Sequence, residues 1–411
     1  MTSGRPTTGM KPIRETLPID EARALAFEAL AQVTRTERLT LTSSGGRVAA
    51  ADIVSTVDVP PFNRAGMDGY AVVAEDTFGA GRYEPRVLRR VQTIYTGETP
   101  TMPIARGECA EIATGAPMPD GADAVVMVEE TERAGDDIRI FTPVYPKQHV
   151  GRRAADFAAG DVVIAHGTLL TPARVGALAA AGTSDVEVFA RPRVAILSTG
   201  NEVAEPGQPL APGHIYDINR YTLETITREH GGEPDARPAA PDTLEDLTAA
   251  LTNAAAEADI IVFSGGSSVG ERDLILDVIR ARGEIVFHGI AVKPGKPTVF
   301  GRVDGKPVLG MPGYPTSCLS NAYMLLVPML RHMAHLPAWH PRIVSVPITR
   351  RVVSTTGRHQ FYTVRVRNGQ AEPAFKASGD ITSMAAADGY IEIPAQTDVV
   401  EAGELVDVKL F

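Results

Sequence analysis

The chain has 411 residues, of which 44% are hydrophobic and 22% charged, so it is typical of globular proteins and long enough for about two to four domains. Its formal net charge of -10 argues against a nucleic-acid partner, because phosphates require a basic surface. The sequence contains neither an apolar run that could cross a bilayer nor the apolar stretch of a signal peptide, so we expect no membrane contact and a cytoplasmic location.

The first predicted element is an amphipathic helix within 19–33, with Asp20 as its candidate N-cap. Its apolar residues fall on one helical stripe, which comprises Ala22, Leu25, Ala26, Ala29, Leu30 and Val33. Between 56 and 147 the sequence changes to short alternating runs that are split by Gly and Pro. This pattern predicts a small β-rich domain.

A second helix is expected after the β-rich domain. Thr171 is its candidate cap, Pro172 lies in its first turn and Gly182 ends it. If this helix packs against the first one, the β-rich domain is an insertion in an N-terminal helical domain. That domain would consist of residues 16–55 and 148–190.

The second half of the chain predicts two further domains. Continuous apolar strands alternate with amphipathic helices over 191–337, which indicates a parallel sheet covered on both faces. Residues 338–411 show short, glycine-punctuated alternation without a helix and are expected to form a small β-barrel or sandwich. The expected fold is therefore multidomain, α/β plus β. Cys109 and Cys318 are too few for a disulfide framework or a zinc ribbon and should be buried, inert thiols.

Three glycine-bearing loops follow predicted strands of the α/β domain, at 198–207, 264–273 and 310–318. In an open parallel sheet, ligands bind outside the carboxyl ends of the strands. Each loop opens toward a helix, so backbone N–H groups can converge on an anion. Any one loop alone is better explained as a tight turn, but three in one sheet favour a binding site. Its candidate residues are Ser198, Thr199, Gly200, Ser264, Gly265, Gly266, Ser267 and Gly313.

These loops also carry acids, which are Glu202, Glu271 and Asp273, and Asp242 lies beside a predicted helix start. Carboxylates repel an anionic ligand unless a cation lies between them. Mg²⁺ is the natural bridge, because it binds one or two carboxylates together with substrate phosphates.

The segment AVKPGKPTVFG adds Lys293 and Lys296, spaced by Pro and Gly, and we expect both lysines to face the ligand. The sequence contains no P-loop, and no GxGxxG motif opens a helix. The usual dinucleotide-binding fold is therefore disfavoured.

Seven motifs occur in chain order: MDGYAV at 67–72, TGAPMPDGADAVVMVE at 114–129, STGNEV, PGQPL followed by IYDINR, SGGSSVGERD, VKPGKPTVFG and MPGYPTSC. Together they resemble the molybdopterin molybdenumtransferase family, which includes the MoeA proteins and the gephyrin E domain. The resemblance implies a homodimer of four-domain subunits. It also implies that molybdate is inserted into adenylylated molybdopterin, with Mg²⁺-dependent cleavage that releases molybdenum cofactor and AMP.

The resemblance also implies site residues at matching positions. Catalytic roles fall on Asp68, Thr114, Glu202, Asp242 and Asp273. Because Asp242 and Asp273 precede or follow strand-end loops, we also predict that these two hold Mg²⁺ against the phosphates. Substrate contacts fall on Asp156, Lys293, Pro312 and Pro315. The sequence departs from the family pattern at Ala155 and Asn201, where acids are usual, at Gly289, often lysine, at Tyr314, often asparagine, and at 63–65.

These departures leave a second functional class open, a gephyrin-like scaffold that binds a protein partner between the α/β and C-terminal domains. An adenylyltransferase that makes the adenylylated intermediate is less favoured, because the chain carries the whole four-domain layout.

Overall fold

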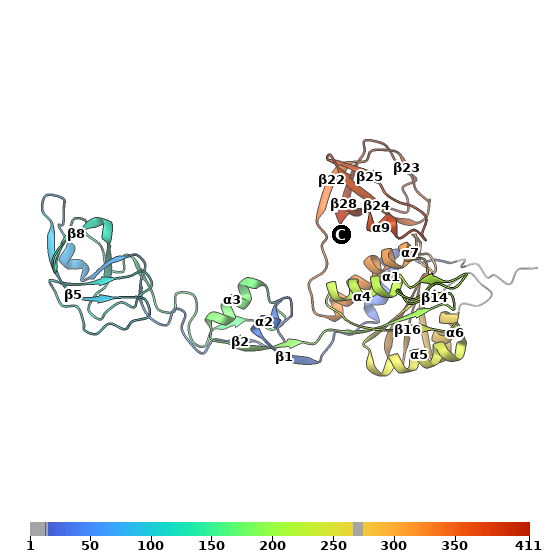
Figure 1. Ribbon diagram of the computed structural model, residues 1–411, viewed down its shortest axis with the longest axis horizontal. Coiled ribbons are helices and arrows are strands. Elements are labelled where there is room, and N and C mark those ends of the chain that lie inside the picture. Colours follow the sequence, from blue (N-terminus) through green and yellow to red (C-terminus); the bar gives the residue numbers. More distant parts are fainter. Residues whose placement is uncertain (1–12, 14, 266–273) are drawn as a thin grey trace, which may run out of the picture. The chain divides into compact units, whose positions relative to one another are not determined.

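The computed structural model describes residues 13, 15–265 and 274–411 and divides into two compact units (Figure 1). One unit comprises Met1–Glu37 and Phe189–Phe411, and the other comprises Arg38–Val188. Within the described residues, no helix combines the length and apolar character needed to span a membrane.

A six-stranded sheet forms the core of the Arg38–Val188 unit and confirms the predicted β-rich domain. All neighbouring strands are antiparallel except β5 and β6. Alternate residues of β4 pack on opposite faces, Tyr70 and Val72 on one and Ala71 on the other, as strand geometry requires. In spatial order the strands are β7 (Ala124–Met127), β4 (Gly69–Val72), β6 (Glu108–Ile112), β5 (Arg86–Ile94), β9 (Asp137–Ile140) and β8 (Thr131–Ala134), with short helices η1 (Ala74–Thr77) and η2 (Val128–Glu130).

Short ladders join the two segments that flank this sheet in sequence, so the β-rich domain is an insertion. They pair β2 (Ile53–Val54) with β11 (Val162–Ile164), and β3 (Arg64–Ala65) with β10 (Val150–Gly151). Thr171 is the N-cap of α3 without a side-chain hydrogen bond, and Gly182 has a positive φ of 75°, which favours glycine at a helix end. The remaining elements here are α2 (Leu41–Ser44), α3 (Pro172–Ala180), β1 (Thr36–Thr40) and β12 (Asp185–Phe189).

The first helix, α1 (Ile19–Glu28), differs from the sequence prediction in three respects. It ends five residues early, its N-cap is Pro18, and Asp20 lies inside its first turn. Its buried residues Ile19, Ala22 and Ala26 join the core of the α/β sheet, because their apolar stripe finds a larger apolar surface there.

The α/β domain contains a six-stranded sheet whose first four strands are parallel. Strand β20 runs antiparallel to both of its neighbours, β21 and β18, so the sheet is mixed where the sequence predicted a parallel one. The polar edge strand β16 carries no apolar run and was not predicted. In spatial order the strands are β16 (Glu233–Ala240), β13 (Arg193–Thr199), β17 (Ile260–Ser264), β21 (Lys306–Met311), β20 (Val299–Val303) and β18 (Gly283–His288).

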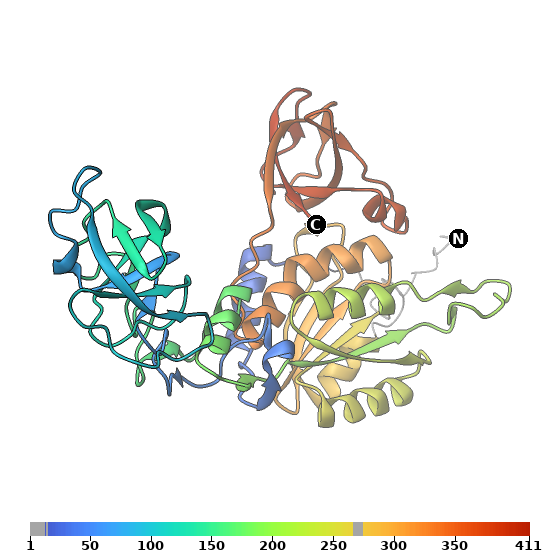
Figure 2. The same ribbon diagram turned by 60° about the vertical axis from the view of Figure 1, so that its left-hand side comes forward.

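Helices cover both faces of this sheet, as expected (Figure 2). Ala195 and Leu197 of β13 face α5 and α6, while Val194 and Ile196 face α4, α7 and α8. Thr243 caps α5 by accepting from the Asp246 N–H. The helices are α4 (Asn219–Glu229), α5 (Leu244–Glu257), α6 (Leu274–Arg282), α7 (Pro315–Asn321), the π-helical η3 (Ala322–Leu326) and α8 (Val327–Met333), and a small ladder pairs β14 (Val203–Ala204) with β15 (Ile215–Tyr216).

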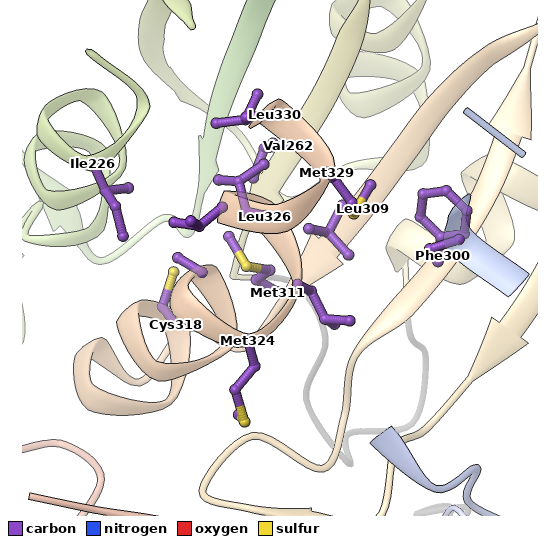
Figure 3. Packing of buried hydrophobic residues seen from close by; sticks show 14 of the residues in the cluster. Ile226, Val262, Phe300, Leu309, Met311, Cys318, Met324, Leu326, Met329 and Leu330 are labelled. Carbon is purple, nitrogen blue, oxygen red and sulfur yellow. The ribbon is translucent and has the colours of Figure 1, made fainter. Parts of the chain in front are cut away.

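Figure 3 shows the core on the α4 side, where side chains of α4, α7 and α8 meet those of the sheet. Cys318 belongs to this core, and burial raises the pKa of its thiol to about 12. Cys109 is likewise buried in the inserted domain, and burial also raises its pKa to about 12. Both cysteines are therefore inert thiols, as predicted.

The C-terminal domain is built on a mostly antiparallel sheet with one four-residue helix that the alternating pattern did not predict. Its edge strand β19 comes from the preceding part of the chain and pairs Lys293 with Gln360. The spatial order is β19 (Val292–Lys293), β24 (His359–Arg367), β26 (Gly389–Ile393), β28 (Leu405–Leu410) and β22 (Ile343–Pro347), and the other elements are β25 (Gln370–Pro373), β23 (Val352–Val353), β27 (Val399–Val400) and α9 (Thr382–Ala385).

Candidate functional site

The three predicted loops leave the α/β sheet side by side. Ser198 of β13 is in register with Ser264 of β17, and Ser264 is in register with Met311 of β21. The Gly265 N–H donates to the Met311 carbonyl over 3.2 Å. Because the strands are parallel, their C-terminal ends form one continuous edge, which carries the hydroxyls of Ser198 and Ser264.

Two glycines at this edge cannot carry a side chain in the observed geometry. Gly200 has φ 134°, and a Cβ there would stand 2.8 Å from Glu202 Oε2. Gly265 has φ 102°, and its Cβ would stand 2.7 Å from the Thr199 carbonyl oxygen. Gly313 follows in the third loop, where the Asn219 amide donates to its carbonyl over 2.8 Å. At Gly265 the first two loops are therefore packed backbone to backbone, which only a small residue allows.

Asp242 and Glu202 lie close together beside these loops. Burial raises the pKa of the Asp242 carboxyl above its usual range, the nearby Thr199 hydroxyl lowers it, and the Glu202 charge raises it further. Asp242 Oδ1, Thr199 Oγ1 and Ser198 Oγ are all buried, and none of the three makes a hydrogen bond of normal geometry among the described residues, so Thr199 acts on Asp242 as a near neighbour. A bound cation could take such oxygen atoms as ligands, or a bound substrate could form hydrogen bonds with them.

Four residues predicted for this site lie outside the described residues, namely Gly266, Ser267, Glu271 and Asp273. Within the part of the chain that the structure describes, no group of three or more His, Cys, Asp or Glu side chains could hold a metal ion. The structure thus places Asp242 and Glu202 at the edge, and the metal pair Asp242 and Asp273 stays a prediction.

Both predicted lysines have partners within the protein. Lys293 donates from Nζ to Thr355 Oγ1 of the C-terminal domain over 2.8 Å, and Lys296 donates to the Ile13 carbonyl over 2.7 Å. Sequence reasoning did not find Thr355, because a threonine in a β-rich stretch gives no signal of such a contact.

The third loop ends where α7 begins, with Pro312 buried and Pro315 in the first turn of the helix. Tyr314, a departure from the family pattern, brings a bulky ring to this tight loop. Tyr314 is 65% exposed, so the loop accommodates the ring by turning it outward. Thr316, just inside α7, donates from Oγ1 to the Asp380 carbonyl of the C-terminal domain over 3.1 Å.

Two other departures from the family pattern also have a local structural setting. Gly289 has φ 93°, and a Cβ there would stand 2.6 Å from Ile13 Cγ2, so the N-terminal segment fills the space that a lysine would need. Asn201 accepts from the Asp242 N–H through Oδ1 over 3.3 Å. Ala155, in the Arg38–Val188 unit, is exposed, and nothing in the structure explains it.

In the Arg38–Val188 unit, the structure brings Asp68 and Thr114 together. Thr114 donates twice to Asp68 Oδ1, from its backbone N–H over 2.7 Å and from Oγ1 over 2.9 Å. These two hydrogen bonds hold the pKa of the Asp68 carboxyl below its usual range. Asp156 is exposed and its N–H donates to the Val59 carbonyl over 2.9 Å. Asp58, which was not predicted, accepts from the Ala159 N–H over 2.9 Å and pairs with Arg153 in the same segment.

Comparison with known proteins covers most of the chain. The family descriptions "MoeA N-terminal region (domain I and II)", "Probable molybdopterin binding domain" and "MoeA C-terminal region (domain IV)" match residues 17–182, 195–332 and 345–411. Molybdopterin molybdenumtransferase 2 of Mycobacterium tuberculosis is 35% identical over 90% of this chain and 93% of its own. The chain belongs to the molybdopterin molybdenumtransferase (MoeA) family.

A second MoeA-family relative, the molybdopterin molybdenumtransferase of Haemophilus influenzae, is 32% identical over 96% of this chain and 98% of its own. Two crystal structures of molybdopterin biosynthesis MoeA proteins from Pyrococcus horikoshii are also similar. One has a TM-score of 0.84 and 40% identity over 96% of this chain and 99% of its own. The other has a TM-score of 0.83 and 32% identity over 97% of this chain and 100% of its own. The family resemblance inferred from the seven motifs is thus confirmed.

Proposed function

We propose that this protein inserts molybdate into adenylylated molybdopterin, with Mg²⁺-dependent cleavage of the adenylate that gives molybdenum cofactor and AMP. The observation that carries the proposal is the edge formed by the three strand-end loops of a MoeA-family chain. The three strands that end there are adjacent, and their last residues in register are Ser198, Ser264 and Met311. A long anionic substrate could span this edge and meet backbone N–H groups and hydroxyls along it.

The oxygen atoms at the edge fit Mg²⁺, which prefers hard oxygen ligands. Asp242 contributes a buried carboxylate oxygen without a partner among the described residues, and Glu202 lies beside it. We propose that Asp242 and Asp273 hold the ion, which would neutralise negative charge on the phosphates. The chain's own residues then bind and orient the substrate, so no protein nucleophile is required.

The scaffold alternative is not favoured, because the curated relatives at 32–35% identity are named for the transferase. A protein partner could still use a crevice of about 400 Å³ between α8 and the C-terminal sheet, lined in part by Tyr323, Arg331 and Trp339. We propose this only as a second, separable role. A homodimer and a cytoplasmic location complete the proposal.

Expression of the protein should restore molybdoenzyme activity to a bacterial strain that lacks the molybdenum insertion step. The Asp273→Asn variant should express equally and fail to restore it, because an amide of the same size replaces a carboxylate in the proposed Mg²⁺ pair. The measurement is nitrate reductase activity in extracts matched for protein level. A wild-type chain that is expressed but does not complement would refute the proposed function.

Asp68 and Asp273 should act in different halves of a shared site, if the inserted domain of one subunit covers the α/β edge of its partner. Co-expressed Asp68→Asn and Asp273→Asn chains would then form heterodimers with one intact and one doubly damaged site. Random mixing makes about half of the dimers heterodimeric, so roughly a quarter of wild-type activity should return. A purified, doubly tagged heterodimer with no AMP release would place Asp68 outside a shared site.

A further inference from the structure

The inserted domain contains a hollow beside Asp68 to which the proposed reaction assigns no part of the substrate. It has a volume of about 220 Å³ and lies over strands β4, β5 and β6, with Asp68 among its lining residues. Its walls include Tyr70, Tyr95 and Val128, of which Tyr95 is 60% and Val128 48% exposed. An exposed aromatic ring and an exposed aliphatic side chain beside one hollow suit a planar, partly apolar ligand.

The Asp68 carboxylate is held rigidly in this hollow. Oδ1 accepts both hydrogen bonds from Thr114, whereas no described residue donates to Oδ2. The turn that carries Tyr95 is tied to the same place, because Thr96 Oγ1 donates to the Thr114 carbonyl over 3.1 Å. The two Thr114 bonds also hold the Asp68 pKa low, so the carboxylate is ionised and only accepts hydrogen bonds. Because Asp68 lines the hollow and Oδ1 is engaged by Thr114, Oδ2 is the carboxylate oxygen left to accept a hydrogen bond from a ligand there.

The charge of the hollow decides which chemical group it can hold. Its lining residues include two carboxylates, Asp68 and Glu111, and neither a lysine nor an arginine. Glu111 is already engaged, since it lies 3.3 Å from Arg133 Nη1 and accepts from Thr93 Oγ1 over 3.3 Å. Phosphate and molybdate are anions and would be repelled here. A neutral, planar group with N–H donors is complementary to this lining.

We propose that this hollow binds the aminopyrimidinone edge of a pterin, with Asp68 Oδ2 accepting its N–H donors and Tyr95 lying against the ring. The inference rests on the proposed function, because only that function supplies a pterin. Of the parts of adenylylated molybdopterin, the pterin ring is neutral and presents adjacent N–H groups, whereas the phosphates do not. The hollow would thereby fix one end of the substrate, and Asp68 would be a specificity-determining residue of the site.

The test is a fluorescence titration of the full-length protein with 6-hydroxymethylpterin, which lacks phosphate and dithiolene. Asp68→Asn should weaken pterin binding at least about ten-fold, because the lost hydrogen bond is made to a charged acceptor. Tyr95→Ala should weaken it several-fold, while Tyr95→Phe keeps the ring and should bind normally. The matched control is Asp120→Asn, the same change at an exposed residue outside the hollow, and it should bind as the wild type does.

A second ligand separates recognition of the amino group from non-specific stacking. The lumazine analogue replaces the 2-amino donor with a carbonyl oxygen, so it should bind the wild type at least about ten-fold more weakly than the pterin. Equal binding of pterin and lumazine, unchanged binding by Asp68→Asn, or no binding of pterin to the wild type would each overturn the inference. If the wild type complements the deficient strain and any of these results is found, the inference fails and the proposed function stands. Asp68-dependent pterin binding in a chain that does not complement would refute the proposed function alone.

Discussion

Asp242→Asn should lower the rate of AMP release by about 100-fold or more, which is the scale of losing one preorganised electrostatic group. The substitution keeps the shape of the side chain and removes the charge that would hold Mg²⁺. The lost rate should not be recovered at high Mg²⁺ if the carboxylate is a direct ligand. AMP release from adenylylated molybdopterin, measured over a range of Mg²⁺ concentrations, is the readout.

The same variant should be at least as stable as the wild type, and this separates a site role from a structural one. The native pKa of Asp242 is raised, mainly by burial, so the native state binds more protons than the unfolded state above the ordinary carboxyl range. Stability therefore falls as pH rises through that window, and the ionised carboxylate destabilises the fold at pH 7. Asparagine removes this cost.

The exposed Glu245 in the first turn of α5 gives a matched control. Glu245→Gln should change neither AMP release nor its Mg²⁺ dependence, because this side chain is not part of the strand-end edge. An Asp242→Asn variant with full activity would exclude Asp242 as an Mg²⁺ ligand, and one less stable than the wild type would contradict the raised pKa of this carboxyl.

The titration of His230 alone should lower the free energy of unfolding of the α/β domain by about 2 kcal/mol between pH 7 and pH 5. His230 is 3% exposed, and neither ring nitrogen has a hydrogen-bond partner among the described residues. Burial, helped by the positive charge of Arg331, lowers its pKa to about 4. Between pH 4 and the ordinary histidine pKa of about 6.5, the imidazole is protonated in the unfolded state and neutral in the native state. The free energy of unfolding therefore falls as pH falls through this range.

Urea denaturation followed by tryptophan fluorescence can measure this loss. Trp339 is the only tryptophan in the sequence, and its ring lies 5.3 Å from that of His230. His230→Phe keeps an aromatic ring at this position and should remove about 2 kcal/mol of the difference in unfolding free energy between pH 7 and pH 5. His340→Gln, at an exposed site, should leave that difference unchanged. An equal acid response in the wild type and His230→Phe would show that His230 does not titrate in this way.

The strand-end edge could be predicted from sequence because it follows from local pattern. Apolar runs identify β13 and β17, and the residues that end them must emerge at one edge if the strands are parallel. Ser198 and Ser264 therefore come together by register alone. The antiparallel strand β20 and the polar strand β16 escaped prediction, because strand direction and edge pairing depend on neighbours distant in sequence.

The sequence by itself determined the βα order, the glycine loops with their acids and the family, since each depends on residues close together in the chain. Only the tertiary structure decided the surroundings of Lys293, Tyr314 and Asp68. Thr355 meets Lys293 from 62 residues away, and Thr114 meets Asp68 from 46 residues away. Such contacts depend on how separate elements pack, and a hydrogen bond of this kind needs only one polar atom at each end, so it leaves no periodic or compositional trace in the sequence.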